Sequence, residues 1–532
     1  MRKLDKRLLR MVKHSKGQFI SVTVIVAAAL CIFIAFSMMS INIRDSVNYY
    51  YESTNFNDIN VKLMKIPESA LEKVKKIPGI KSVEGRISFD VPLRIEDSAD
   101  EKVTVRIISI SDNDEMINKL YMKNGNSISN INQVIVLDQF ASARKIKPGD
   151  KVTPYINGMN QELSVSGVAA SPEFVYLMEN DQALLPAPEK FGIFYVSKEF
   201  AQSVYGYRGN YNELLIKVYG EKNIDDLADK IEKELDAFGV KQIITRENQL
   251  SNNVLNQKIE GIDKMSSAVP VLFLMVAALI ISIMLSRTVN NDRIAIGVLK
   301  ALGYGNVNIL SHYTKYSLAI GLAGSAIGIS LGLLLSGVLT SVFIGFFNIP
   351  IVKVNVYYSY IIYAIILTST FCIISGLFGA RSVIHIVPAD SMRPEAPKSG
   401  KRILLERLTF IWRRIGFSWK MVIRNIFRTK KRFAFLVLGL ALSYSINVVP
   451  LYMINAMSAM FTLQYGEYQK MDYTIDFARP LSEKSMQEVK KLAQIDRIEA
   501  KVEYPFELQN GWKKKTVGII GIPKDTELYE FK

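Results

Sequence analysis

Several residue types are scarce in this 532-residue chain. It has two cysteines, Cys31 and Cys372, and three histidines, His14, His312 and His385. Both cysteines lie in apolar runs, so no disulfide holds a polar part of the chain together, and the histidines are too scattered to predict a metal site. No G-x-x-x-x-G-K-[ST] pattern occurs, so the chain has no such phosphate-binding loop of its own. We expect no metal, no cofactor and no catalytic residue in this chain.

Charge is missing from five long runs. Asp, Glu, Lys and Arg are absent from 18–43, 268–286, 317–352, 354–380 and 433–466. A helix needs about 20 apolar residues to cross the hydrocarbon core of a membrane. We therefore predict five membrane helices, at 18–43, 268–286, 316–345, 356–380 and 433–456. The first run exceeds the apolar core of a signal peptide, which spans about 7–15 residues. The lack of intramembrane charges argues against a secondary transporter.

The net charge of +16 is unevenly distributed. Residues 1–17 hold seven Lys/Arg and one acid, and 381–432 hold 14 Lys/Arg and three acids, whereas 44–267 hold 28 basic and 33 acidic residues. Basic flanks stay in the cytoplasm. We thus expect a multi-pass protein of the cell (cytoplasmic) membrane with its N-terminus inside. The segments 1–17, 287–315 and 381–432 are then cytoplasmic, and 44–267 and 457–532 lie outside. Basic charge beside membrane helices does not indicate nucleic-acid binding.

The segment 44–267 is typical of an α/β domain. Short apolar runs predict strands, among them one over 82–95, and helical spacing covers 67–76 and 224–238. Residues 251–267 contain no helix breaker except Gly261, so we expect a helical stalk that leads into the second membrane helix. The segments 1–17 and 415–426 are basic and amphipathic, which is typical of helices lying at the membrane surface among lipid headgroups.

An internal repeat is also visible. Residues 58–84 resemble 472–499, and the same offset of 415 places the start of the first predicted membrane helix on that of the fifth. The expected fold is an α-helical transmembrane bundle with an α/β extracytoplasmic domain between the first and second helices, and a partial second copy. We expect the natural chain to continue for about 270 residues, the length of 111–380 in the first copy.

Two short patterns are candidates for function. In the loop after the second predicted membrane helix, Ile296, Leu299 and Leu302 precede Gly303. This predicts a short helix along the membrane surface that ends at the glycine and offers a face to a partner. In the third membrane helix, small residues recur every four positions, which favours close packing against another helix, with a pore-lining face as the alternative. These helix-packing residues are Gly324, Gly328, Gly332 and Ser336.

The run RIAIGVLKALG at 293–303 resembles the coupling segment of FtsX/MacB-type ABC transporter permeases. In that family an acid often stands where this chain has Ala295. Residues 380–393 resemble the close of the family's permease unit, 419–432 resemble the lead-in to a new one, and 133–167 are similar to its external β insert. The resemblance implies that the following residues couple the chain to an ATPase: Arg293, Ile296, Gly297, Leu299, Lys300, Ala301, Leu302 and Gly303.

The resemblance further implies a permease subunit of the mechanotransmission type. A separate dimer of cytosolic ATPase subunits would use the ATP and push on the coupling segment, and the stalk would relay the movement outward. The work outside would be export or removal of a lipoprotein, peptide or antimicrobial, or control of a cell-envelope enzyme. A membrane-anchored sensor or scaffold whose external domain binds a ligand remains the alternative.

Overall fold

A computed structural model describes residues 3–94, 103–111, 116–179, 185–220 and 224–391, and in the C-terminal part 410, 412, 416–428, 430–475, 477, 481–482, 484–493, 496–510 and 513–530. Its contacts divide the chain into two units, Met1–Ser399 and Gly400–Lys532. Each unit is described by itself.

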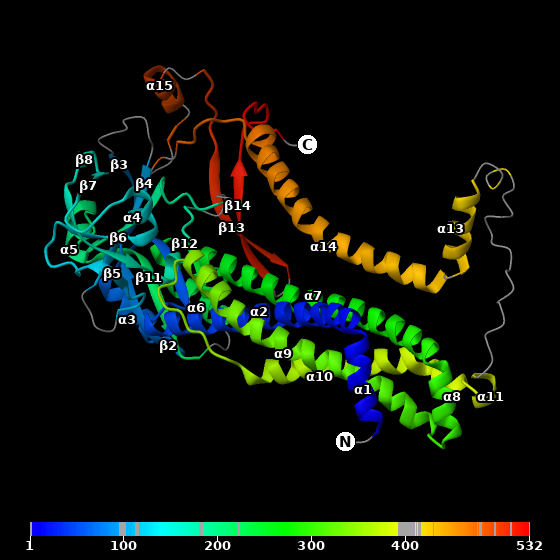
Figure 1. Cartoon of the computed structure of the whole chain (residues 1–532). Helices are drawn as coiled ribbons and strands as arrows, with labels where there is room; N and C mark the ends of the chain where they lie inside the picture. Colours follow the sequence, from blue (N-terminus) through cyan, green and yellow to red (C-terminus); the bar gives the residue numbers. More distant parts are fainter. Residues whose placement is uncertain are drawn as a thin grey trace. The chain divides into compact units, whose positions relative to one another are not determined.

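In the described part of the chain, four helices are long and apolar enough to cross a membrane. They run side by side (Figure 1), with α2 and α10 each packed against both α7 and α9. A helix of 40 residues rises about 60 Å, twice the thickness of the hydrocarbon core, so α2, α7 and α9 extend well beyond it. The helices are α2 (Lys16–Ser53), α7 (Leu250–Asn291), α9 (Asn306–Phe346) and α10 (Tyr358–Ala380).

The expected stalk and the second membrane helix are one continuous helix. α7 runs without interruption through Pro270. It links the α/β domain that lies between α2 and α7 in the chain, called the outer domain from here on, to the opposite end of the bundle. α2 extends in the same way to Ser53, about ten residues past the predicted end of the first crossing. Two helices therefore connect the outer domain to the bundle.

The outer domain contains two sheets. The smaller has the order β12-β1-β11-β2, with every neighbouring pair antiparallel. Helices α3 (Glu68–Lys75) and α6 (Ile224–Leu235) contact β2 and β12. Their apolar faces form one buried core with the strands, in which Val74 and Ile231 are fully buried. The strands are β1 (Ile59–Pro67), β2 (Ile80–Arg86), β11 (Asn210–Val218) and β12 (Val240–Thr245).

The larger sheet closes on itself. Its order is β5-β9-β6-β10-β4-β3-β7-β8, and a further pairing of β7 with β9 joins six of the strands into a ring. Two neighbouring pairs, β4–β10 and β6–β9, are parallel. The strands are β3 (Ser88–Arg94), β4 (Val103–Ile110), β5 (Tyr121–Gly125), β6 (Gln133–Leu137), β7 (Lys151–Ile156), β8 (Met159–Asn160), β9 (Leu163–Ala170) and β10 (Phe191–Ser197). Helices α4 (Asp138–Arg144) and α5 (Lys198–Tyr205) complete the domain.

The single strand predicted over 82–95 was wrong. The chain forms β2 in the smaller sheet and β3 in the larger one, and it changes sheet at the fully buried Ile87. The Ile87 amide donates to Ser109 Oγ, and its carbonyl accepts from the Ser109 amide. Because these bonds take up both backbone groups of Ile87, the bend is stable, although the apolar pattern continues through it.

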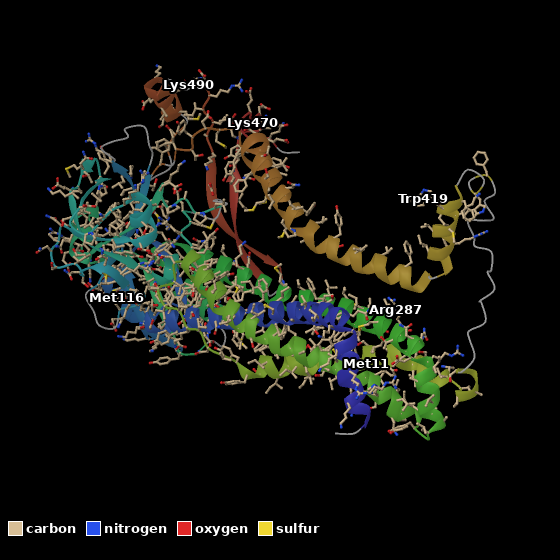
Figure 2. All side chains as sticks on the ribbon, viewed as in Figure 1. Met11, Met116, Arg287, Trp419, Lys470 and Lys490 are labelled. Atoms are coloured by element: carbon tan, nitrogen blue, oxygen red, sulfur yellow. The ribbon has the colours of Figure 1, made fainter. Side chains whose placement is uncertain are left out.

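The N-terminal helix α1 (Lys3–His14) contacts the bundle. Leu8, Met11 and Val12 are partly buried against the apolar core at the end of the bundle farthest from the outer domain (Figure 2, where Met11 is labelled). The apolar side of α1 thus faces protein at these three positions; the side chain of Leu4 lies outside the described part. Contact of α1 with lipid headgroups stays a prediction.

The second unit contains α13 (Phe417–Arg428), α14 (Lys430–Thr462), α15 (Lys484–Ala493) and an antiparallel hairpin of β13 (Val502–Asn510) and β14 (Lys513–Gly521). α14 covers the predicted crossing at 433–456, and that crossing stays a prediction. An offset of 415 brings α3 and β3 onto α15 and β13. The duplication itself also stays a prediction. Ile415 and most of the linker between 392 and 415 lie outside the described residues.

Candidate functional site

A short helix fills the turn between α7 and α9. α8 (Arg293–Ala301) begins after Asp292, and a glycine stops it. Gly303 has a φ of +89°, its amide donates to the Lys300 carbonyl, and the Tyr304 amide donates to the Leu299 carbonyl. This pair of bonds is the Schellman arrangement, which favours glycine because of its left-handed backbone. The sequence pattern Leu299–Gly303 therefore sets where α8 ends.

One side of α8 is held tightly against the chain. Ile296 is fully buried in the core of the bundle, and Leu299 packs against the same core. Gly297 is buried beneath α11 (Pro388–Ser391), where a Cβ on the glycine would lie 1.7 Å from Ser391 Oγ. Only a glycine permits this approach.

Lys300 fixes the same side by hydrogen bonds. Its Nζ donates to the carbonyls of Val383 (2.6 Å) and Ile386 (2.7 Å), at the end of the 3-10 turn Arg381–His385. A cation at the carbonyl end of a helical turn interacts favourably with the last carbonyl groups of that turn. α8 and residues 381–391 are thus joined into one element.

The other side of α8 is exposed and apolar. Ile294 and Leu302 are 63% and 71% exposed, and Val298 between them is also exposed. Ala295 and Ala301 complete this side. A contiguous exposed apolar surface held on a fixed base is typical of a protein-binding site. We call these five residues the outer face of α8.

The structure divides the predicted coupling residues into two sets. Ile296, Gly297, Leu299 and Lys300 hold α8 in place, whereas Ala301, Leu302 and Gly303 are exposed. Leu302 lies on the exposed side of α8, whereas Ile296 lies on the buried side. Six residues along a helix turn it by about 600°, which puts Leu302 about 120° away from Ile296. Arg293 is half-exposed at the start of α8.

The small residues of α9 lie against α2. A Cβ built on Gly324 would be 2.7 Å from Val26 Cγ1, one on Gly328 2.5 Å from the Ala27 carbonyl oxygen, and one on Gly332 2.9 Å from the Cys31 carbonyl oxygen. Ser336 is buried on the same side, and its hydroxyl donates to the Leu333 carbonyl within α9. Close backbone approach at small residues is how helices associate strongly in a membrane. The backbones of the two helices therefore approach closely over about two turns.

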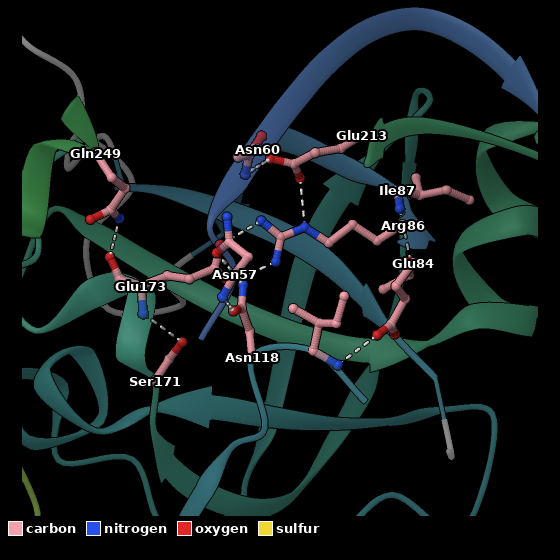
Figure 3. Close-up of polar contacts among 12 residues, drawn as sticks. Asn57, Asn60, Glu84, Arg86, Ile87, Asn118, Ser171, Glu173, Glu213 and Gln249 are labelled. Carbon is pink, nitrogen blue, oxygen red and sulfur yellow. Dashed lines mark hydrogen bonds and ion pairs between the residues drawn. The ribbon is translucent and has the colours of Figure 1, made fainter. Parts of the chain in front are cut away.

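A buried ionic cluster joins the outer domain to the top of α7. Arg86 Nη1 and Nη2 each donate to Glu173 at 2.7 Å, and Arg86 Nε donates to Glu213 at 2.7 Å (Figure 3). Asn60 Nδ2 donates to the other Glu213 oxygen at 2.8 Å. The Glu173 carbonyl accepts from Gln249 Nε2, and Gln249 caps α7. The cluster thus connects the smaller sheet, the turn after β9 and the stalk.

Burial and charge act in opposite directions on Glu213. Burial alone would raise the pKa of this carboxyl, but the Arg86 guanidinium outweighs burial and holds the pKa at about 2. A carboxylate with a depressed pKa contributes stability above the pKa of an ordinary glutamate, and this contribution is lost as the pH falls toward 2. Glu213 is therefore ionised at neutral and mildly acidic pH.

The region that holds α8 and the glycine face matches a known family. Residues 267–388 match the model of the FtsX-like permease C-terminal family. The chain contains an FtsX-like permease domain. This domain includes every predicted coupling and helix-packing residue, together with the turn that binds Lys300.

One curated relative shares sequence with the chain. An uncharacterised ABC transporter permease of Methanocaldococcus jannaschii is 29% identical over 202 residues, which are 37% of this chain and 49% of the relative. The chain spans about half the length of that relative. Part of the chain is thus homologous to an ABC transporter permease.

Two solved outer domains are similar at low scores. The periplasmic region of MacB from Actinobacillus actinomycetemcomitans is 14% identical, with a TM-score of 0.26, covering 40% of this chain and 95% of that one. The extracellular domain of the ABC-type transporter YknZ from Gram-positive bacteria is 16% identical, with a TM-score of 0.25, covering 35% and 100%.

Sequence reasoning missed two parts of the site. It identified 380–393 and 293–303 separately, but nothing in either segment indicated that Gly297 contacts Ser391 or that Lys300 binds the turn at 381–385. It also gave no role to Arg86, Glu173 or Glu213. No local signal was available, because β2 also carries Lys81 and Glu84 and Arg86 does not stand out among these charges.

Proposed function

We propose that the chain is the permease subunit of a mechanotransmission ABC transporter, and that the outer face of α8 binds a separate cytosolic ATPase. The exposed apolar side of α8 carries this proposal, because its other side is fixed by Gly297 and Lys300. A helix held in this way transmits a push and does not bend away from it. In this account the N-terminus and α8 are cytoplasmic, and the ATPase dimer supplies the ATP hydrolysis.

The long helices support transmission to the outside. α7 begins at Leu250, beside the Arg86 cluster, and is continuous over 42 residues to its end next to α8. Ser251 Oγ on α7 also accepts from the Tyr176 amide of the outer domain at 2.8 Å. Displacement of α8 along α7 would therefore reach both sheets of the outer domain. The work done there would be release or export of a lipoprotein, peptide or antimicrobial, or control of a cell-envelope enzyme.

The test is a charge placed on the outer face of α8. The binding partner is a nucleotide-binding protein captured by co-purification with the full chain. We expect Leu302→Asp to weaken its binding by about 100-fold, because an apolar contact is lost and a carboxylate must be buried. Binding and stimulated ATP hydrolysis are measured on the full chain in lipid nanodiscs. Met159→Asp is the matched control, since Met159 is 61% exposed on the outer domain. Unchanged binding by the Leu302 variant would remove α8 as the docking site.

A further inference from the structure

The start of α8 is tied to the N-terminal helix α1. Arg7 Nη2 on α1 donates to Asp292 Oδ2 at 2.9 Å, and Tyr313 OH on α9 donates to the same oxygen at 2.9 Å. Both partners of the ion pair are less than one-third exposed. Asp292 thus joins α1, α8 and α9 through one carboxylate.

The carboxylate of Asp292 does not cap the helix that it precedes. Asp292 is the one residue between α7 and α8, and it occupies the N-cap of α8. An N-cap aspartate normally accepts a hydrogen bond from the first turn of its own helix, but this side chain makes no such bond. Its hydrogen-bonding capacity goes instead to α1 and α9. A local stabilising bond is given up for a contact between elements.

α1 leads directly into α2, which like α7 connects the bundle to the outer domain; we call α2 and α7 the stalk helices. Only Ser15 separates α1 from α2, and backbone hydrogen bonds continue across it, from the Ser15 amide to Met11 and from the Phe19 amide to Ser15. Ser15 Oγ and Tyr316 OH are hydrogen-bonded at 3.0 Å. α2 then continues to Ser53, where Tyr50 and Tyr51 are buried with Tyr176 of the outer domain. A displacement of α1 would therefore be transmitted through the continuous helix α2 to the outer domain.

We propose that Asp292 is a positioning residue that makes α8 drive both stalk helices. One path runs from α8 into α7, and the second runs through Asp292 and Arg7 into α1 and α2. This inference rests on the proposed function for the origin of the push. Its distinct content is that α1 is part of the transmission and not only a membrane anchor.

The Arg7–Asp292 ion pair, called the tie from here on, is tested by exchanging its two charges. Arg7→Asp and Asp292→Arg each put like charges together, whereas the double variant restores an opposite pair. In the full chain in nanodiscs, we expect amide exchange of α1 to rise about tenfold in each single variant and to recover in the double variant. Lys6→Asp is the matched control, because Lys6 is exposed on the same helix. Exchange of the outer-domain strands reports whether a variant is folded.

A second measurement, of stimulated ATP hydrolysis, tests whether the Arg7–Asp292 ion pair transmits movement from α8 to α1. Each single variant should bind the co-purifying nucleotide-binding protein within about twofold of the wild type, yet stimulate its ATP hydrolysis about tenfold less. The double variant should recover stimulation, and Tyr313→Phe should lose part of it without a change of charge. A merely structural tie would alter exchange and leave stimulation unchanged.

Failure of the inference differs from failure of the proposed function. If the wild-type chain stimulates hydrolysis and both single variants stimulate it equally, the tie does not transmit and the inference is overturned. If the wild-type chain neither binds nor stimulates the nucleotide-binding protein, the proposed function is overturned and the transmission role of Asp292 falls with it. The exchange data then decide only whether Asp292 holds α1 to the bundle.

Discussion

Replacing Arg86 with methionine is expected to destabilise the outer domain by about 3–5 kcal/mol, because the carboxylates of Glu173 and Glu213 would remain buried without their cation. All three side chains are less than one-tenth exposed, so water cannot replace the guanidinium. The loss would also free the turn at Glu173 from the smaller sheet. We expect local opening to start at β2 and β11.

Amide exchange in β2 and β11 of the full chain measures this effect. Lys151→Met is the control, since Lys151 and Glu162 form an exposed ion pair that contributes little to stability. The triple variant Arg86→Met, Glu173→Leu, Glu213→Leu should recover much of the stability, because it leaves no buried charge. Wild-type protection in the single variant would show that the cluster does not hold the sheet to the turn.

Gly328→Leu is expected to separate α9 from α2. A Cβ at Gly328 would lie 2.5 Å from the Ala27 carbonyl oxygen and 2.9 Å from Leu30 Cβ, and α2 carries the most buried side chains of the bundle. Backbone atoms cannot yield to a new side chain, so the helices must move apart, at a cost of about 1–3 kcal/mol or more. The membrane bundle would lose its closest helix contact.

Thermal unfolding of the full chain in detergent checks this expectation. Gly345→Leu is the matched control, because Gly345 lies on the same helix and a Cβ there meets nothing within 4 Å. The control should unfold at the wild-type temperature, and the Gly328 variant several degrees lower. Equal unfolding temperatures would mean that close packing at Gly328 contributes nothing to the bundle.

Local signals in the sequence gave the elements of the membrane part. Charge-free runs predicted helices that the structure contains at all four candidate spans, and the lack of breakers in 251–267 predicted the continuity of α7. Gly303 predicted the end of α8 because a single residue determines that cap. Each of these signals depends on residues close together in the chain.

Contacts between distant segments could not be predicted in the same way. Arg86 meets Glu173 and Glu213 across 87 and 127 residues, and Arg7 meets Asp292 across 285. No periodicity in one segment specifies its partner in another. The sheet change at Ile87 has a related cause, since an apolar pattern shows that a residue is apolar and does not show which neighbour covers it.

The central claim is that the outer face of α8 binds an ATPase, and site-specific photo-crosslinking in cells tests it most directly. A photoreactive residue at position 302, which is 71% exposed, should form an adduct with a nucleotide-binding protein. The same residue at position 296, which is fully buried, should form none with that protein. Adducts of position 302 only with lipid or with this chain itself, while a nucleotide-binding protein co-purifies, would contradict the account.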